Sequence, residues 1–302
     1  MKRALRISAI GAVLLAAVLA LIIYLLFLPL PDSPARPASG ELHLVERGDR
    51  TIAYFARGEG PRVLLAASAG REVSDFNELA DALVAGGYRT IAVEAPGIGE
   101  SDMIGEGANL FDLAEDVMAA LDDDCGNEPD CRASVIGHAF GNRVVRATAA
   151  ANPNRIHGVV LIAAGGRNVI PERAAEALRN CFDPRRTFVQ RREDVRYAFF
   201  AGDNAIPDFW LRGWYRHTAA MQGRASPATE TDDWLAAGTG PMLVVQALGD
   251  RIAPKEDTAD MLAETYPDRV SVALIEDAGH ALLPEQPDAI VEAVLDFLYT
   301  IE

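Results

Sequence analysis

The sequence has few of the residues that bind metals or form disulfide-rich folds. Its 302 residues include three cysteines and five histidines, without a C-x-x-C pair or a histidine cluster. Zinc sites are built from such groups, so we expect no metal centre. A phosphate-binding loop and a dinucleotide fingerprint are also missing from the sequence, and we expect no cofactor.

Basic residues are also scarce. Lysine and arginine total 28 against 44 aspartate and glutamate residues, which gives a formal net charge of -16. Binding to phosphate backbones or to anionic membrane surfaces needs a basic patch, so we expect no nucleic-acid partner. Hydrophobic residues make up 50% of the chain, enough for one large core in a single domain of about 250 residues.

The N-terminus has a different composition. Lys2, Arg3 and Arg6 precede an uncharged run from Ile7 to Leu30. This run exceeds the roughly 20 residues that cross a bilayer as a helix. We expect residues 1–30 to form one transmembrane anchor, with the N-terminus cytoplasmic and the following domain extracytoplasmic, in the periplasm if the source is bacterial. A cleaved signal peptide is the alternative.

The segment 31–40 contains three prolines and reads as a stiff linker between the anchor and the domain. Further along, Cys125 and Cys131 lie in the loop "CGNEPDC" and form a candidate disulfide for an oxidising compartment. Two unpaired thiols are the alternative. We expect the remaining cysteine, Cys181, to be buried.

Short apolar runs alternate with helical stretches from residue 41 to residue 302, which indicates a parallel sheet covered on both faces. An antiparallel hairpin is expected at the sheet edge over 41–58, around Gly48 and Asp49. The expected buried strands are 62–68, 89–96, 133–137, 157–164, 241–248 and 270–277, and the expected helices are 75–87, 109–123 and 287–301.

The pattern breaks at about 167–240, a helix-rich insertion that we call the cap. It holds all three tryptophans, Trp210, Trp214 and Trp234. They suggest a lid over a pocket, or the ordinary core of a helical subdomain, and both interpretations can hold together. His217 and the mixed-charge segment 191–196 are expected at the surface.

The stretch Val135–Val145, "VIGHAFGNRVV", joins a strand to a helix through a G-x-x-x-G turn at Gly137 and Gly141. We call residues 137–141 the elbow. This arrangement resembles the nucleophile elbow of the α/β-hydrolase fold, and the resemblance covers nearly all of 41–302. It implies a mostly parallel central sheet flanked by helices, with a helical cap insertion and, here, a preceding transmembrane helix.

The resemblance also implies the site residues. Asp250 follows one strand in the place of the family's acid, and His280 follows the last strand in the place of its base. We expect the two to be hydrogen-bonded in a pocket. The oxyanion-hole donors would be the backbone N–H groups of Ala69 and Phe140.

The elbow lacks a nucleophile, because Ala139 occupies the position of the family's serine. Four interpretations remain open. The protein is a non-catalytic relative that binds a ligand or partner, or an enzyme in which His280 acts as general base without a covalent step. Alternatively, the alanine was introduced into an active serine enzyme, or the match is coincidental.

Ser68 is an unorthodox nucleophile candidate in the enzyme interpretation, or else a loop serine bonded to backbone. His138, next to Ala139, is expected to orient the elbow rather than to catalyse. By resemblance, the ligand is a small ester, amide, lactone or related acyl compound.

Overall fold

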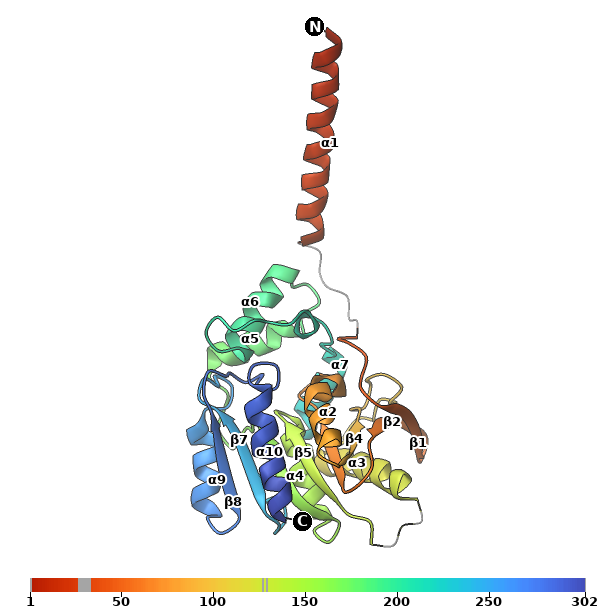
Figure 1. Ribbon diagram of the computed structural model, residues 1–302, viewed down its shortest axis with the longest axis vertical. Helices are drawn as coiled ribbons and strands as arrows, with labels where there is room; N and C mark the ends of the chain where they lie inside the picture. The colour runs from red at the N-terminus through yellow and green to blue at the C-terminus, as the bar shows by residue number, and fades with distance from the viewer. Residues whose placement is uncertain (1, 27–33, 127, 129, 302) are drawn as a thin grey trace.

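The computed structural model describes residues 2–26, 34–126, 128 and 130–301, with only the backbone given for 2–10, 25 and 26. An N-terminal helix, α1 (Lys2–Leu26), is drawn apart from the α/β domain, on the side of the cap (Figure 1). In the part of the chain that is described, no helix meets the length and hydropathy needed to span a membrane. The expected anchor and linker include residues 1 and 27–33, which lie outside the described residues.

The domain is built on an eight-stranded sheet with the order β1-β2-β4-β3-β5-β6-β7-β8. β1 pairs antiparallel with β2 and β2 with β4, while every later pairing is parallel. The predicted hairpin and the predicted mostly parallel sheet are therefore both confirmed. The strands are β1 (Glu41–Arg47), β2 (Arg50–Arg57), β3 (Arg62–Ala66), β4 (Arg89–Val93), β5 (Ala133–His138), β6 (Ile156–Ile162), β7 (Met242–Ala247) and β8 (Val270–Ile275).

Helices cover both faces of the sheet, which explains why its central strands read as continuous apolar runs. One face packs against α2 (Asn77–Ala85) and α10 (Pro287–Ile301). The other packs against α3 (Leu110–Cys125), α4 (Gly141–Ala151) and α9 (Ala259–Thr265). Asn109 caps the N-terminus of α3, where its side chain accepts hydrogen bonds from the first helical turn in a capping box.

The last strand, β8, was predicted to be buried, but several of its residues are exposed. β8 lies at the edge of the sheet, and Val272 and Leu274 are 36% and 52% exposed. An edge strand has a neighbour on one side only, so its apolar residues cannot be covered as fully as those of β5, where every residue is buried.

The cap contains α5 (Glu172–Cys181), α6 (Phe188–Phe199), the 3-10 helix η2 (Asp208–Leu211), α7 (Arg216–Ala225) and α8 (Thr231–Trp234). Figure 1 shows α5 and α6 between α1 and the sheet. Trp210 and Trp214 pack with Phe199 and Phe200 in a separate hydrophobic cluster. Trp210 and Trp214 therefore form core of the helical cap, as the second interpretation states, whereas Trp234 packs in the main core beside the sheet. A lid function stays a prediction.

The segment 191–196 was expected to be solvated, and that prediction is wrong for half of it. Arg191, Asp194 and Val195 are buried, and Asp194 receives hydrogen bonds from Asn180 and Arg186 in the cap. His217 is exposed, as expected.

Of the two alternatives for Cys125 and Cys131, a disulfide or two unpaired thiols, the structure shows the disulfide. Cys125 and Cys131 are joined by a disulfide at the end of α3. Cys181 is a buried free thiol in the cap, and burial raises its pKa.

Candidate functional site

A cavity of about 810 Å³ lies between the carboxyl ends of the strands and the cap. The loops that follow β3, β5, β6, β7 and β8 all contribute to its wall, since the carboxyl ends of parallel strands meet at one edge of the sheet. The cavity is lined by five of the predicted site residues, Ser68, Ala69, Ala139, Phe140 and His280, and by Trp234 of the cap.

The elbow is so tight that its two glycines have no room for a side chain. A Cβ atom built on Gly137 would lie 2.5 Å from the carbonyl carbon of Gly141. On Gly141 it would lie 2.0 Å from the carbonyl oxygen of Ala66. Between them Ala139 takes a φ of 50° and donates its N–H to the Ile162 carbonyl over 2.9 Å. This geometry presents the methyl group of Ala139 at the cavity.

Asp250 and His280, in the loops after β7 and β8, come together as the resemblance to the α/β-hydrolase fold implied. His280 Nδ1 lies 2.8 Å from Asp250 Oδ2, and both side chains are buried. The other carboxylate oxygen, Oδ1, accepts hydrogen bonds from the N–H groups of Ile252 and Ala253, each at 2.8 Å. Because a carboxylate only accepts, Nδ1 carries the proton of the neutral imidazole and Nε2 has a free lone pair.

The loop that carries His280 is held from two sides. His138 Nε2 donates to the His280 carbonyl over 2.9 Å, and the Ala281 N–H donates to the Phe199 carbonyl of the cap over 2.8 Å. Burial, together with the nearby His280, lowers the pKa of His138 to about 4. His138 is therefore neutral at physiological pH, and it positions the loop of His280 rather than the elbow.

Two backbone N–H groups remain without a partner at the cavity wall. Within the described residues, neither Ala69 nor Phe140 donates its N–H to any acceptor. The Ser68 hydroxyl likewise makes no hydrogen bond to a described residue, so the interpretation as a backbone-bonded loop serine is not what the structure shows. Only the Ser68 carbonyl is engaged, by the N–H of Arg71.

The loop after β3 is attached to the cap by contacts that sequence reasoning missed. Gly70 accepts from the Tyr215 N–H over 2.9 Å and donates to Gln222 Oε1 over 2.8 Å. Arg71 is fully buried, forms two hydrogen bonds with Asp75, and lies 4.7 Å from the ring of Trp214. In the sequence Arg71 is only a charged residue beside the loop, and its burial could not be predicted because that burial depends on the distant cap.

The arrangement supplies a proton acceptor, His280 Nε2, and two free N–H donors around one cavity. It supplies no hydroxyl or thiol at position 139. Among the described residues, no group of histidine, cysteine, aspartate and glutamate side chains is arranged to hold a metal ion. The catalytic roles of Asp250, His280 and the two N–H groups stay predictions.

Comparisons with known proteins agree with this architecture. Residues 63–293 match the family described as the alpha/beta hydrolase family. The chain is 24% identical to a 2-hydroxy-6-oxononadienedioate/2-hydroxy-6-oxononatrienedioate hydrolase of Cupriavidus pinatubonensis, over 74% of this chain and 81% of that protein. It is 28% identical to a pimeloyl-[acyl-carrier protein] methyl ester esterase of Aeromonas hydrophila, over 80% and 96%.

A solved structure matches over the whole length. The crystal structure of a membrane phospholipase A, described as a bacterial virulence factor, superposes with a TM-score of 0.68 at 20% identity. The match covers 100% of this chain and 99% of the other. At this identity the likeness is one of fold.

Proposed function

Because the chain belongs to the alpha/beta hydrolase family, we propose that it hydrolyses a small ester or related acyl compound, with His280 as general base toward a water molecule. The observation that carries the proposal is the buried Asp250–His280 pair, hydrogen-bonded over 2.8 Å at a cavity large enough for a small ligand.

The reaction would need no covalent intermediate. His280 Nε2 takes a proton from water as the water oxygen attacks the carbonyl carbon, and the Asp250 carboxylate stabilises the imidazolium that forms. The N–H groups of Ala69 and Phe140 would stabilise the oxyanion. When the tetrahedral intermediate collapses, the imidazolium returns the proton to the leaving alkoxide, and the products are an acid and an alcohol.

A second candidate function is ligand binding without turnover. It is favoured by Ala139, because a methyl group stands at the family's nucleophile position and cannot attack. Ser68 is an alternative nucleophile within the enzyme proposal, since the residue lines the cavity and its hydroxyl makes no hydrogen bond to a described residue.

The decisive experiment measures ester hydrolysis by the full-length protein and by three variants, Ala139→Ser, His280→Ala and Ser68→Ala. Chromogenic esters of short and medium acyl chains are the substrates. Turnover by the parent that is lost in His280→Ala and kept in Ser68→Ala supports water activation. Loss in Ser68→Ala as well moves the nucleophile to Ser68. An inert parent beside an active Ala139→Ser variant supports the binding function and contradicts hydrolysis by the parent.

We also propose that α1 anchors the domain in a membrane, with the domain on the extracytoplasmic side. The support is the uncharged run 7–30, the exposed apolar side chains of α1 such as Leu19 and Ile22, and the full-length match to a protein titled a membrane phospholipase. Sedimentation with membranes after a carbonate wash tests the anchor. Recovery of the parent in the soluble fraction, like a chain lacking residues 1–33, refutes it.

A further inference from the structure

We propose that the cavity selects acyl compounds that carry a carboxylate, and that Arg143 of α4 binds this second charge. The inference rests on the proposed function, since it names the substrate class of the same site. It starts from the arginines of the cavity wall in a protein whose net charge is -16. Four arginines line the cavity, against the acidic Glu230 and Asp257; they are Arg143, Arg167, Arg179 and Arg216.

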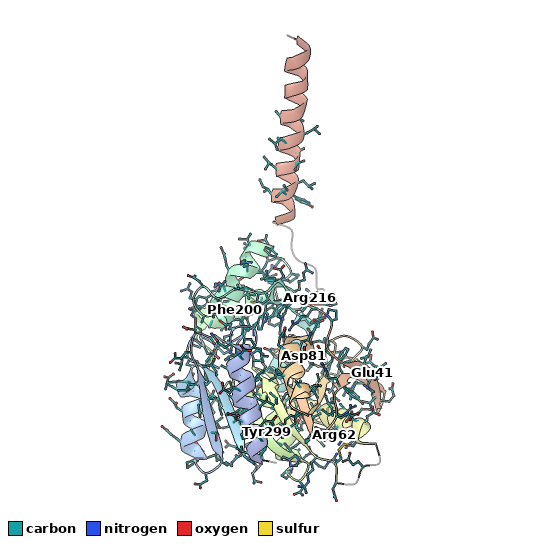
Figure 2. All side chains as sticks on the ribbon, in the orientation of Figure 1. Glu41, Arg62, Asp81, Phe200, Arg216 and Tyr299 are labelled. Atoms are coloured by element: carbon teal, nitrogen blue, oxygen red, sulfur yellow. A yellow bond between two sulfur atoms is a disulfide. The ribbon has the colours of Figure 1, made fainter. Side chains whose placement is uncertain are left out.

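Two of these arginines are already neutralised. Arg167 forms an ion pair with Asp232, and Arg179 forms one with Glu172 over 3.3 Å. Within the described residues, Arg143 forms no ion pair with a carboxylate. Arg216 is also without a carboxylate, but it is exposed and lies in the cap (Figure 2). Arg143 is therefore the inner cationic group of the cavity that lacks a counter-charge.

The surroundings of Arg143 make an unpaired charge costly. Its side chain is half-buried, its one hydrogen bond to a described residue goes to the Ser226 hydroxyl, and its guanidinium lies 5.6 Å from the ring centre of Trp234. Burial lowers its pKa. A guanidinium has several N–H donors in a planar fork that fits a carboxylate, so most of its donors are still available to a ligand.

Arg146, one turn further along α4, strengthens the positive potential. It is completely buried, donates one hydrogen bond to the Gly165 carbonyl over 3.0 Å, and lies 5.4 Å from the Trp234 ring centre. Its Nε and Nη1 atoms have no partner among the described residues. Two neighbouring guanidinium groups without a carboxylate repel each other, and an anionic ligand at Arg143 would offset that repulsion.

The position of Arg143 also indicates the form of the ligand. It follows Ala139 by four residues and stands in the first turn of α4, whose N-terminus is itself favourable for a negative charge. One helical turn rises about 5.4 Å, so the bound carboxylate would lie a short chain away from the carbonyl that the oxyanion donors hold. The half-ester of a short dicarboxylic acid has this form: an ester at one end and a carboxylate at the other.

The test compares two probes of nearly equal size, monomethyl adipate and the uncharged dimethyl adipate. Binding to the full-length protein is measured by isothermal titration calorimetry in the parent, Arg143→Gln and Arg143→Lys. Arg192→Gln is the control, since Arg192 is an exposed arginine whose loss changes the net charge equally. The parent and the variants are all compared in a His280→Ala background, so that the proposed hydrolysis does not consume the probes during the titration.

The parent should bind the half-ester about 10- to 100-fold more tightly than the diester. Arg143→Gln should remove this preference for the half-ester, while Arg143→Lys should keep part of the preference and Arg192→Gln all of it. Equal affinity of the parent for both probes overturns the inference and leaves the proposed function intact, and this comparison requires no variant to fold. Absence of binding by either probe also overturns the inference, while the panel of chromogenic esters decides the proposed function separately.

Discussion

Asp250→Asn is predicted to reverse the protonation of the His280 ring. In the parent, Oδ1 of Asp250 accepts from the N–H groups of Ile252 and Ala253, and Oδ2 accepts from Nδ1 of His280. An asparagine has one oxygen and one NH₂ group. If the oxygen stays with the two backbone donors, the NH₂ group faces His280, whose Nδ1 must then accept and whose proton moves to Nε2.

The opposite orientation of the asparagine amide costs free energy, which can be estimated from the hydrogen bonds that it would break. It would turn the NH₂ group toward two buried N–H donors and leave both unsatisfied, at about 1–3 kcal/mol each. The total of about 2–6 kcal/mol corresponds to a preference of roughly 30-fold or more. With Nε2 protonated, the ring loses its general-base function, which contributes about 10²- to 10⁴-fold to rates.

Long-range proton–nitrogen NMR of histidine-labelled protein measures the tautomer directly. His280 is identified by the signals that disappear in His280→Gln. We expect a protonated Nδ1 and an unprotonated Nε2 in the parent, and the reverse in Asp250→Asn. The same tautomer in both proteins would refute this reasoning, whatever the variant does to turnover.

Three further predictions concern the elbow and the buried acids. Gly141→Ala should abolish folding, seen as loss of soluble protein, because its Cβ would lie 2.0 Å from a carbonyl oxygen, whereas Gly105→Ala, where a Cβ contacts nothing, should not. Ala139→Gly should raise the free energy of unfolding in urea by about 1 kcal/mol, since it relieves the φ of 50°; unchanged or lower stability contradicts this. Burial and the nearby Glu72 raise the pKa of Glu94 from 4.5 to about 8, so the folded state holds a proton that the unfolded state releases. The parent therefore loses stability as the pH rises toward 8. The free energy of unfolding of Glu94→Gln should rise relative to that of the parent between about pH 5 and about pH 9, by up to about 4 kcal/mol. Parallel curves of unfolding free energy against pH for the two proteins would contradict the raised pKa.

The sequence predicted the elements because they follow from local apolar patterns, and the resemblance to the α/β-hydrolase fold implied the base–acid pair. Asp250 and His280 each come directly after an apolar strand, and the sheet brings their loops together. The burial of Arg71 was not predictable in this way, since it depends on Trp210 and Trp214 of the distant cap. Arg143 escaped notice for a related reason: a helix shows its spacing in the sequence, but the absence of a counter-charge shows only in three dimensions.

The hydrogen bond from the Ala281 N–H to the Phe199 carbonyl ties the loop of His280 to the end of α6 in the cap. This amide can exchange with solvent only when the end of α6 moves away from the loop of His280, so its hydrogen-exchange rate reports separation of the cap from the base. A Cβ on Gly279 would also lie 2.5 Å from the same carbonyl oxygen, which leaves little tolerance between the two segments. A cap transplanted from a relative would therefore have to bring its own matching loop, and the two segments should be exchanged as one module.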